Sequence, residues 1–477
     1  MNNKIIVSLI ILIVLCTCGT LTVLAGLFLV SRAPFAIPSA VVETLPPSEM
    51  EADTLPPQPL HTPLPAKSGN DSVSSLPVEL ALAMDEIQLQ VSDIRGLQAD
   101  QSFTRALLTE SDLQHKVETE FFEDYSADDA EEDVLVLSKL GLLPEGFDIL
   151  GLYKNLYAEQ IAGYYDSETK EMYVVQGEGF TGIERMTYAH EYTHTLQDQA
   201  YDLEKGLKIN EDYCENETEY CSAVTALVEG DAVFTEQEWL LKHGSEQDQQ
   251  EIQDFYLSYS SPVFDTAPMY LQKDFLFPYL YGLEFVYSLN DRGGYTLVNQ
   301  AFQNPPVTTE QILHPDKYPA EKPVEVSLPD IQSALPETWK MIDENELGEW
   351  YSYLVLAHGR EKKYSLPETT ARTAAAGWGG DRYALFADPT AKETVFILRT
   401  EWDTENDALE FLSAMKQYGE NRWGDPVSKD NRSILWTDTT DGSVNLSRNG
   451  STTTWLIVPD ETIWQTMQTI LPDSLTQ

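Results

Sequence analysis

Residues 187–199, "TYAHEYTHTLQDQ", constrain the fold of this chain more than any other stretch. His190 and His194 are spaced so that on a helix both project from one face, one turn apart. Glu191 lies between them, and the flanking positions 188, 189, 192, 193 and 195 are uncharged in a chain in which 23% of residues are charged. We therefore predict a buried helix that carries two imidazoles and a carboxylate beneath a cleft.

This spacing is typical of a zinc site. Two neutral imidazoles one turn apart can hold one zinc ion at about 2.0–2.1 Å. Glu191, about 100° further round the helix, can then act as general base toward a water molecule. A helix with two incidental histidines is the alternative reading of the same residues.

A catalytic zinc ion usually has three protein ligands, so a third is needed. The stretch "ALVEGDAV", residues 226–233 on a second predicted helix, offers Glu229. Alternatively, Glu229 is an ordinary solvent-exposed glutamate on a helix, but its apolar neighbours argue against an exposed position. Gly230 would let the two helices approach closely.

A histidine ligand is commonly oriented by an acceptor for its second ring N–H. Asp231 is one candidate for that role. Asp198, one turn after His194, competes for it.

Residues 5–30, "IIVSLIILIVLCTCGTLTVLAGLFLV", contain no charge and are long enough to cross a bilayer with some tilt. We expect an uncleaved transmembrane signal anchor, with residues 1–4 in the cytoplasm and the bulk of the protein outside at the cell surface. "SRAPFAIPSA" offers a late cleavage site, and cleavage there would make the protein secreted.

The 30 Lys and Arg residues against 78 Asp and Glu give a net charge of −48, which repels phosphate backbones and excludes nucleic acid as a partner. Cys214 and Cys221 lie close together in the part expected outside the membrane, where a local disulfide is the leading interpretation. A metal pair and two free thiols are the alternatives. No feature of the sequence indicates an oligomeric state.

"TYAHEYTHTL" followed by "EGDA" resembles the gluzincin metallopeptidases, the clan that includes thermolysin. The resemblance covers roughly residues 150–320 and implies His190, His194 and Glu229 as zinc ligands and Glu191 as catalytic base. "EQIAGYYD", "FPYLYG", "TEQILHP" and "GWGGDRYALF" also look like stretches of uncharacterised membrane-anchored or secreted bacterial proteins of this type. Thermolysin-like enzymes support a histidine with an Asp four residues after the ligand Glu, a position that Val233 takes here.

The clan also implies an edge strand that pairs with the substrate backbone, for which residues 172–175 are the natural choice. It further implies a later His or Tyr that stabilises the oxyanion. We consider His314 first, then Tyr318 and Tyr279.

The expected fold class is α+β: a mainly helical zincin-like catalytic domain with a small edge-strand sheet, then a smaller α+β domain. A Pro- and Ser-rich stalk is expected over residues 31–78 and a helical region over 79–148. The metallopeptidase domain is expected over 149–340, and the second domain, of unknown role, over 341–477.

The function expected is that of a membrane-anchored, extracytoplasmic zinc metallopeptidase acting on peptide or protein substrates. One alternative is a catalytically silent zinc-binding surface protein that serves as a binding or scaffold module. Another is a zinc hydrolase of a non-peptide amide.

Overall fold

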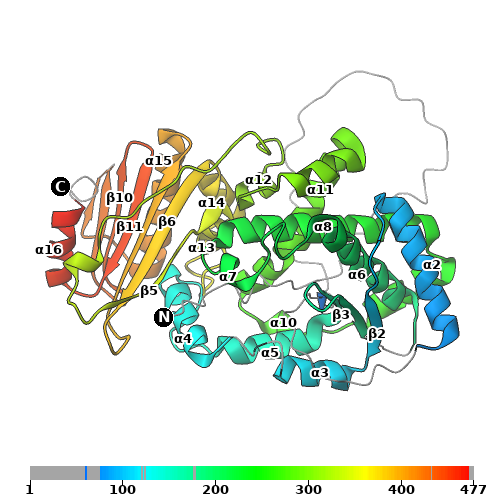
Figure 1. Cartoon of the computed structure of the whole chain (residues 1–477). Coiled ribbons are helices and arrows are strands. Elements are labelled where there is room, and N and C mark those ends of the chain that lie inside the picture. The colour runs from blue at the N-terminus through cyan, green and yellow to red at the C-terminus, as the bar shows by residue number, and fades with distance from the viewer. Residues whose placement is uncertain are drawn as a thin grey trace.

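The computed structural model describes residues 60–61, 76–119, 122, 125–175, 179–430 and 432–471. This part of the chain is a mixed α+β structure, as expected, with a large antiparallel sheet at one end and most of the helices at the other (Figure 1). The predicted membrane anchor, residues 5–30, and nearly all of the predicted stalk lie outside the described residues. Within them, no helix has both the length and the apolar character needed to cross a membrane.

The first half of the chain is mostly helical, but the region 79–148, expected to be helical throughout, also contains a strand. Its elements are β1 (Leu60–His61), α2 (Val78–Arg95), β2 (Thr104–Leu108), α3 (Glu110–Thr119), α4 (Ala127–Leu140), α5 (Ile149–Gln160), β3 (Ile161–Asp166), β4 (Glu171–Val175), α6 (Gly182–Tyr201), α7 (Glu211–Cys214), α8 (Thr218–His243), α9 (Glu246–Ser258), α10 (Pro262–Thr266), α11 (Met269–Gln303) and α12 (Thr309–Leu313).

The small sheet has the strand order β1-β3-β4-β2. β3 and β4 form an antiparallel hairpin, while β2 pairs parallel to β4 and β1 pairs parallel to β3. The expected strand at residues 172–175 is therefore present as β4, but it is not an edge strand. Both edges of β4 are paired within the sheet: β3 pairs with one edge, and β2, which precedes the hairpin in the chain, pairs with the other. No edge of β4 is left for a substrate backbone.

Two long helices, α8 and α11, cross at a pair of glycines. A Cβ on Gly230 would lie 2.1 Å from the backbone of Gly282, and one on Gly282 would lie 2.0 Å from the carbonyl oxygen of Ala226. Gly230 thus permits a close approach, as expected, but to α11 rather than to the helix with the two histidines. α11 continues beyond Gly293 and Gly294, where the backbone leaves the helical conformation and the helix bends.

The second half of the chain builds the large sheet, with strand order β5-β6-β7-β11-β10-β9-β8 and antiparallel pairing throughout. Its elements are η3 (Gln332–Ala334), β5 (Lys340–Asn345), α13 (Gly348–Ala357), α14 (Glu368–Ala375), β6 (Trp378–Ala387), β7 (Thr394–Trp402), α15 (Glu405–Trp423), β8 (Ser428–Lys429), β9 (Ser433–Thr439), β10 (Gly442–Asn449), β11 (Thr452–Val458) and α16 (Glu461–Ile470).

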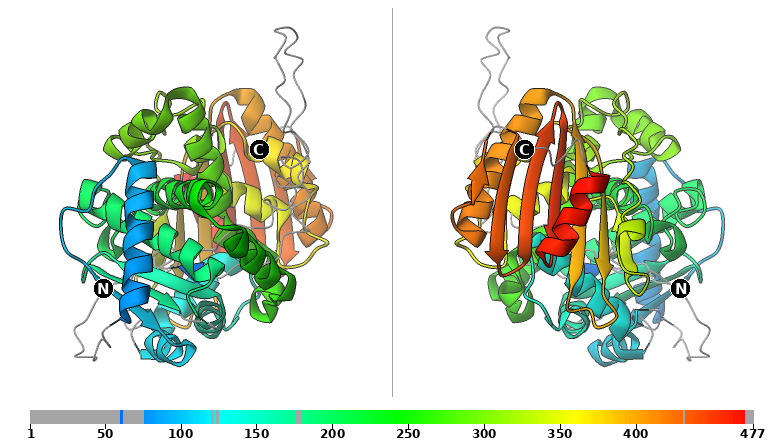
Figure 2. Two further views of the ribbon diagram at one scale, coloured as in Figure 1. Left: turned by 90° about the vertical axis from the view of Figure 1, so that its right-hand side faces the viewer. Right: turned by 90° about the vertical axis from the view of Figure 1, so that its left-hand side faces the viewer.

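Alternating side chains of this sheet enter two different cores. Phe396 belongs to the core that α15 covers, whereas its neighbour Ile397 belongs to the core that α16 covers, and Figure 2 shows α16 lying across one face of the sheet. The α15 side is continuous with the core of the helical half. Trp350 of α13, for example, packs on Phe277 of α11 with ring centroids 4.6 Å apart. Hydrophobic packing therefore runs across residue 340 without a break.

Candidate metal centre

α6 carries the two histidines as expected. It begins with a capping box, in which the backbone N–H of Thr181 donates to Glu184 Oε2 at 2.9 Å. His190, Glu191 and His194 are each fully buried. The helix is a central element of the helical half, packed against α2, α8, α9, β3 and β4.

β3 lies close against the turn of this helix that carries Glu191. A Cβ on Gly163 would lie 2.9 Å from Cγ2 of Thr187 and 3.3 Å from Cγ of Glu191. Only glycine leaves that space, so Gly163 determines how near the small sheet comes to the Glu191 side chain.

The ligand atoms of His190, His194 and Glu229 all lie within 4.8 Å of one another. Oε2 of Glu229 is 3.3 Å from Nε2 of His190 and 3.5 Å from Nε2 of His194. Glu229, on α8, is fully buried like the two histidines. The structure thus brings together the three residues that the sequence singled out.

This arrangement fits a zinc ion. Nε2 of His194 and Oε1 of Glu229 are buried and make no hydrogen bond to any described residue, which is costly unless another group satisfies them. Two imidazoles and one carboxylate are a donor set that zinc takes in catalytic sites. Although burial opposes it, hydrogen bonds to Glu229 and Glu236 raise the pKa of His190 to about 10. The site therefore attracts positive charge.

The second ring nitrogen of each histidine is held by a residue that we did not predict. His190 Nδ1 lies 3.0 Å from Oε2 of Glu236, and His194 Nδ1 lies 2.9 Å from Oε1 of Gln197. Gln197 in turn donates from Nε2 to Oδ2 of Asp231 at 2.8 Å. Asp231 was expected to contact a histidine directly, but it contacts Gln197, which in turn contacts His194. The spacing offered a signal, because Glu236 lies two turns after Glu229 on one face of α8.

Asp198, the competing candidate, is placed elsewhere. Its carboxylate accepts hydrogen bonds from the Tyr165 hydroxyl at 2.7 Å and from Nζ of Lys170 at 2.5 Å. Both donors belong to the β3–β4 hairpin, which folds back onto α6. Asp198 therefore fastens the small sheet to the helix and does not orient His194.

Glu191 lies in the same buried environment. Burial raises its pKa well above the ordinary value, and the negative charges of Glu229 and Glu236 act in the same direction, while His190 opposes them. A carboxylate with a raised pKa is a better proton acceptor, which suits a general base.

Tyr279 is the one residue among the three considered for oxyanion stabilisation that lies beside this centre. Burial, together with the carboxylates of Glu229 and Glu191, raises the pKa of Tyr279 well above its usual value. Its hydroxyl is buried and makes no hydrogen bond to any residue that the structure describes. The proton therefore stays on the hydroxyl and is available for donation.

His314, which we considered first, and Tyr318 are engaged elsewhere. His314 Nε2 lies 2.9 Å from Oε1 of Glu349 on α13, and the Tyr318 hydroxyl donates to the carbonyl oxygen of Asn304 at 2.5 Å. Both contacts join the segment after α12 to neighbouring structure. Of the three candidates, only Tyr279 is thus placed beside the candidate metal centre.

A second group of carboxylates, Glu310, Glu321 and Asp403, also brings its oxygens together. Here Nζ of Lys317 lies 2.7, 2.8 and 2.9 Å from the three of them in turn. One ammonium group already pairs with all three carboxylates, so we interpret this group as an ion-pair network that joins the two halves of the chain.

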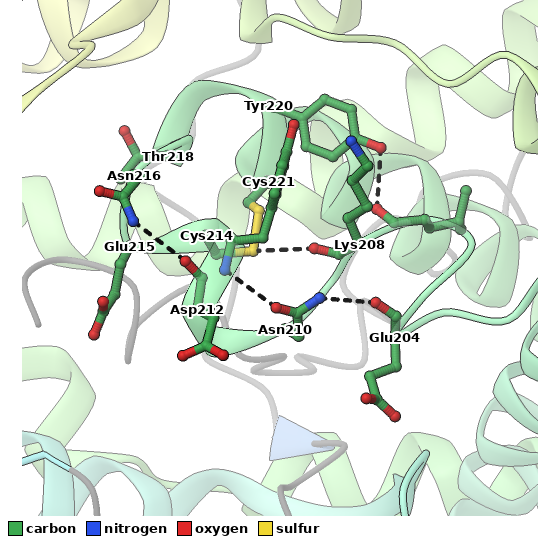
Figure 3. The surroundings of a disulfide bond; sticks show 12 residues. Glu204, Lys208, Asn210, Asp212, Cys214, Glu215, Asn216, Thr218, Tyr220 and Cys221 are labelled. Carbon is green, nitrogen blue, oxygen red and sulfur yellow. Dashed lines mark hydrogen bonds between the residues drawn. A yellow bond between two sulfur atoms is a disulfide. The ribbon is translucent and has the colours of Figure 1, made fainter.

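The expected disulfide is present between Cys214 and Cys221, with Cα atoms 5.6 Å apart (Figure 3). It joins α7 to the first turns of α8. Asn210 caps α7 by accepting from the backbone N–H of Tyr213 at 3.1 Å, and the Tyr220 hydroxyl donates to the Leu207 carbonyl at 3.0 Å. The bridge thus secures the loop that leads into the helix with Glu229.

A family model described as "Domain of unknown function (DUF8575)" matches residues 337–468. The match runs from just before β5 into α16, so it covers the large sheet, and the candidate metal centre lies outside it. Comparisons with curated proteins and with solved structures gave no match. The matched family describes the sheet-bearing part of this chain.

Proposed function

We propose that the protein is a zinc metallopeptidase that hydrolyses peptide bonds, with His190, His194 and Glu229 as zinc ligands and Glu191 as general base. The observation that carries the proposal is the convergence of three fully buried ligand side chains from α6 and α8. The gluzincin-like residues of the sequence lead to the same assignment. Glu236 and Gln197 support it, because each holds a histidine by the ring nitrogen that faces away from Glu229.

Each protein group has a distinct task in this proposal. A zinc ion would supply a Lewis acid that polarises the substrate carbonyl and acidifies a water molecule. The Glu191 carboxylate takes a proton from the attacking water and delivers it to the departing amine nitrogen. The Tyr279 hydroxyl donates a hydrogen bond to the oxygen on which negative charge develops. Burial of all these groups keeps bulk water from weakening their interactions.

We also propose that the protein works outside the cytoplasm, held at the membrane by residues 5–30. The uncharged N-terminal segment is the basis of this assignment. The Cys214–Cys221 disulfide supports it, because such bonds persist in oxidising compartments.

The test is hydrolysis of a mixed peptide library by the zinc-loaded full chain. Three samples are compared with wild type: wild type with a chelator, Glu191→Gln, and the matched control Glu238→Gln, whose side chain pairs with Lys242 on the exposed side of α8. We expect cleavage by wild type and by the control variant only, with zinc still bound to Glu191→Gln. A folded, zinc-loaded wild type that cleaves no peptide would contradict the proposal and favour a binding or scaffold role.

A further inference from the structure

A cavity of about 60 Å³ lies where α8 and α11 meet α13 and β6. Thr218, Ser222 and Thr225 line it from α8, and they share one face of that helix with Glu229. Thr225 lies one turn before Glu229, or about 6 Å along the helix axis. From α11 the cavity is lined by Pro278, the residue directly before Tyr279. The part of its wall that Thr225 forms therefore lies one helical turn from Glu229.

The charge of this cavity is negative. Three carboxylates line it, those of Glu219, Asp274 and Glu346, and most of the remaining wall is apolar or aromatic. Among the described residues that line it there is no Lys, Arg or His. A ligand that buries an aliphatic chain and places a positive charge near these carboxylates would match both features.

The three carboxylates differ in how far they are already satisfied. Glu219 accepts two hydrogen bonds from Thr309, at 2.5 and 2.8 Å. Asp274 accepts from the side chains of Trp350 and Tyr351, at 2.8 and 2.7 Å.

Glu346 makes no ion pair in the part of the chain that the structure describes, although it is only partly exposed. The nearby guanidinium of Arg382 pairs with Glu344 instead, at 3.2 Å. Glu346 is thus the carboxylate most available to a cationic ligand.

An orphaned hydroxyl provides an independent sign of a ligand. Thr225 is 4% exposed, and its Oγ1 is buried without a hydrogen-bond partner among the described residues. A threonine inside a helix can usually satisfy its hydroxyl on a carbonyl one turn earlier, which Thr225 does not do. Its side chain lines the cavity, where a ligand N–H can reach it.

We propose that this cavity binds the ammonium side chain of a lysine next to the scissile bond, which makes the protein a lysine-selective peptidase. The proposal rests on the proposed function and names its substrate class. A cavity of about 60 Å³ exceeds the ~10–15 Å³ that one water-sized group needs, so it has room for several such groups, as an aliphatic chain with an ammonium end requires.

A cation in the cavity would change the ionisation of two of the lining carboxyl groups. Burial, and after it the charges of Asp381 and Glu217, raises the pKa of Glu346 to about 7. Burial also raises the pKa of Asp274 to about 6, against the hydrogen bonds that it accepts. A positive charge placed in the cavity would favour the ionised form of both carboxyls.

The first test compares cleavage of matched peptides in which one position is lysine or norleucine. Norleucine has the shape of lysine without its charge. We expect kcat/KM for the lysine peptide to exceed that for the norleucine peptide by about 10–100-fold, as for a charge-assisted hydrogen bond in a buried site. Equal values for lysine and norleucine would overturn the proposal.

Substitutions then locate the preference in this cavity. We expect Glu346→Gln to reduce the lysine-to-norleucine ratio at least to a third, and Asp274→Asn, as a second variant, to reduce it in the same direction. The matched control Glu238→Gln, which loses a carboxylate paired with Lys242 on the exposed side of α8, should keep the wild-type ratio. An unchanged ratio in both cavity variants would place lysine recognition elsewhere and overturn the assignment.

A binding measurement separates failure of this inference from failure of the proposed function. Saturation-transfer NMR with n-butylamine as the probe and n-butanol as the neutral control detects occupancy without any turnover. We expect butylamine to bind to the full chain, and Glu346→Gln to weaken this binding. If butylamine binds but no peptide is cleaved, the ammonium site stands and the peptidase proposal falls. If peptides are cleaved but butylamine does not bind, the lysine site falls and the peptidase stands.

Discussion

His190 Nδ1 lies 3.0 Å from Oε2 of Glu236, and both side chains are fully buried. Because the carboxylate holds this nitrogen, Nε2 of the same ring is the one left facing Glu229, at 3.3 Å. A single helix, α8, thereby supplies both the proposed third ligand, Glu229, and the carboxylate that orients His190.

This contact predicts a metal-affinity defect for Glu236→Gln. The amide keeps a hydrogen-bond acceptor but removes the charge that makes the histidine a stronger base, so zinc affinity should fall by about 10–100-fold. Competition with a chromophoric chelator measures the change. Glu238→Gln, on the same helix, is the control and should bind zinc as wild type does; equal affinities for the two variants would show that Glu236 does not tune the site.

Tyr279→Phe should impair catalysis without loss of metal. Removal of one oxyanion donor usually lowers kcat by about 10²–10³-fold. We expect zinc content and thermal stability to stay at wild-type values. His314→Gln and Tyr318→Phe should retain most activity. A larger loss of activity in either variant than in Tyr279→Phe would favour that residue as the oxyanion donor.

Gly163→Ala should displace Glu191, because the added methyl group clashes with atoms of β4 and α6. The new methyl group would lie 2.8 Å from the carbonyl oxygen of Tyr173 and 2.9 Å from Cγ2 of Thr187, so β3 or α6 has to move. We expect at least a tenfold loss of kcat/KM, since misplacements of about 1 Å at a catalytic group can cost about 10²-fold. Gly146→Ala, where a Cβ meets no atom within 4 Å but the backbone φ is +70°, controls for backbone strain and should stay active.

Asp343 predicts how stability depends on pH. Its side chain is fully buried, and burial raises its pKa from 3.8 to about 6 in the folded protein. The folded state therefore holds a proton more tightly than the unfolded state, so this group's stabilising contribution is complete below pH 4. It is lost as the pH rises through 6, by about 3 kcal/mol in total.

Asp343→Asn should remove that loss, because an amide does not ionise and its N–H can donate to the Tyr383 hydroxyl that now donates to Asp343. Urea unfolding at several pH values measures the effect. The difference in unfolding free energy between variant and wild type should grow in favour of the variant between pH 4 and 7. A difference that stays constant over this range would show that Asp343 ionises in the folded state as it does in the unfolded state.

Much of the fold could be predicted from local patterns. The apolar run within residues 394–402 predicts a strand that is buried on both faces, and β7 spans that stretch with each face in its own core. β2 was missed because "TRALL" consists largely of good helix formers. Its parallel pairing with β4, far away in the chain, makes it a strand, and pairing of that kind leaves no mark on the local sequence.

In the site, too, local spacing predicts some residues, while others depend on how the helices pack. His190 and His194 are related by helix geometry alone, so their common direction could be predicted. Which acceptor reaches each Nδ1 depends on the rotation and height of α8 against α6, and this left Glu236 and Gln197 unpredicted. Tyr279 could not be told apart from the other tyrosines in the sequence, because its position beside Glu229 depends on the close crossing of α8 and α11 at Gly230 and Gly282.

The position of β3 has a consequence for how a peptide reaches Glu191. A Cβ on Gly163 would lie against the Glu191 side chain, and the β3 edge that faces away from β4 pairs with residues 60–61. The backbone groups of a strand edge can serve one partner at a time. A peptide that aligned on β3 would therefore compete with the chain's own N-terminal region for the same backbone groups.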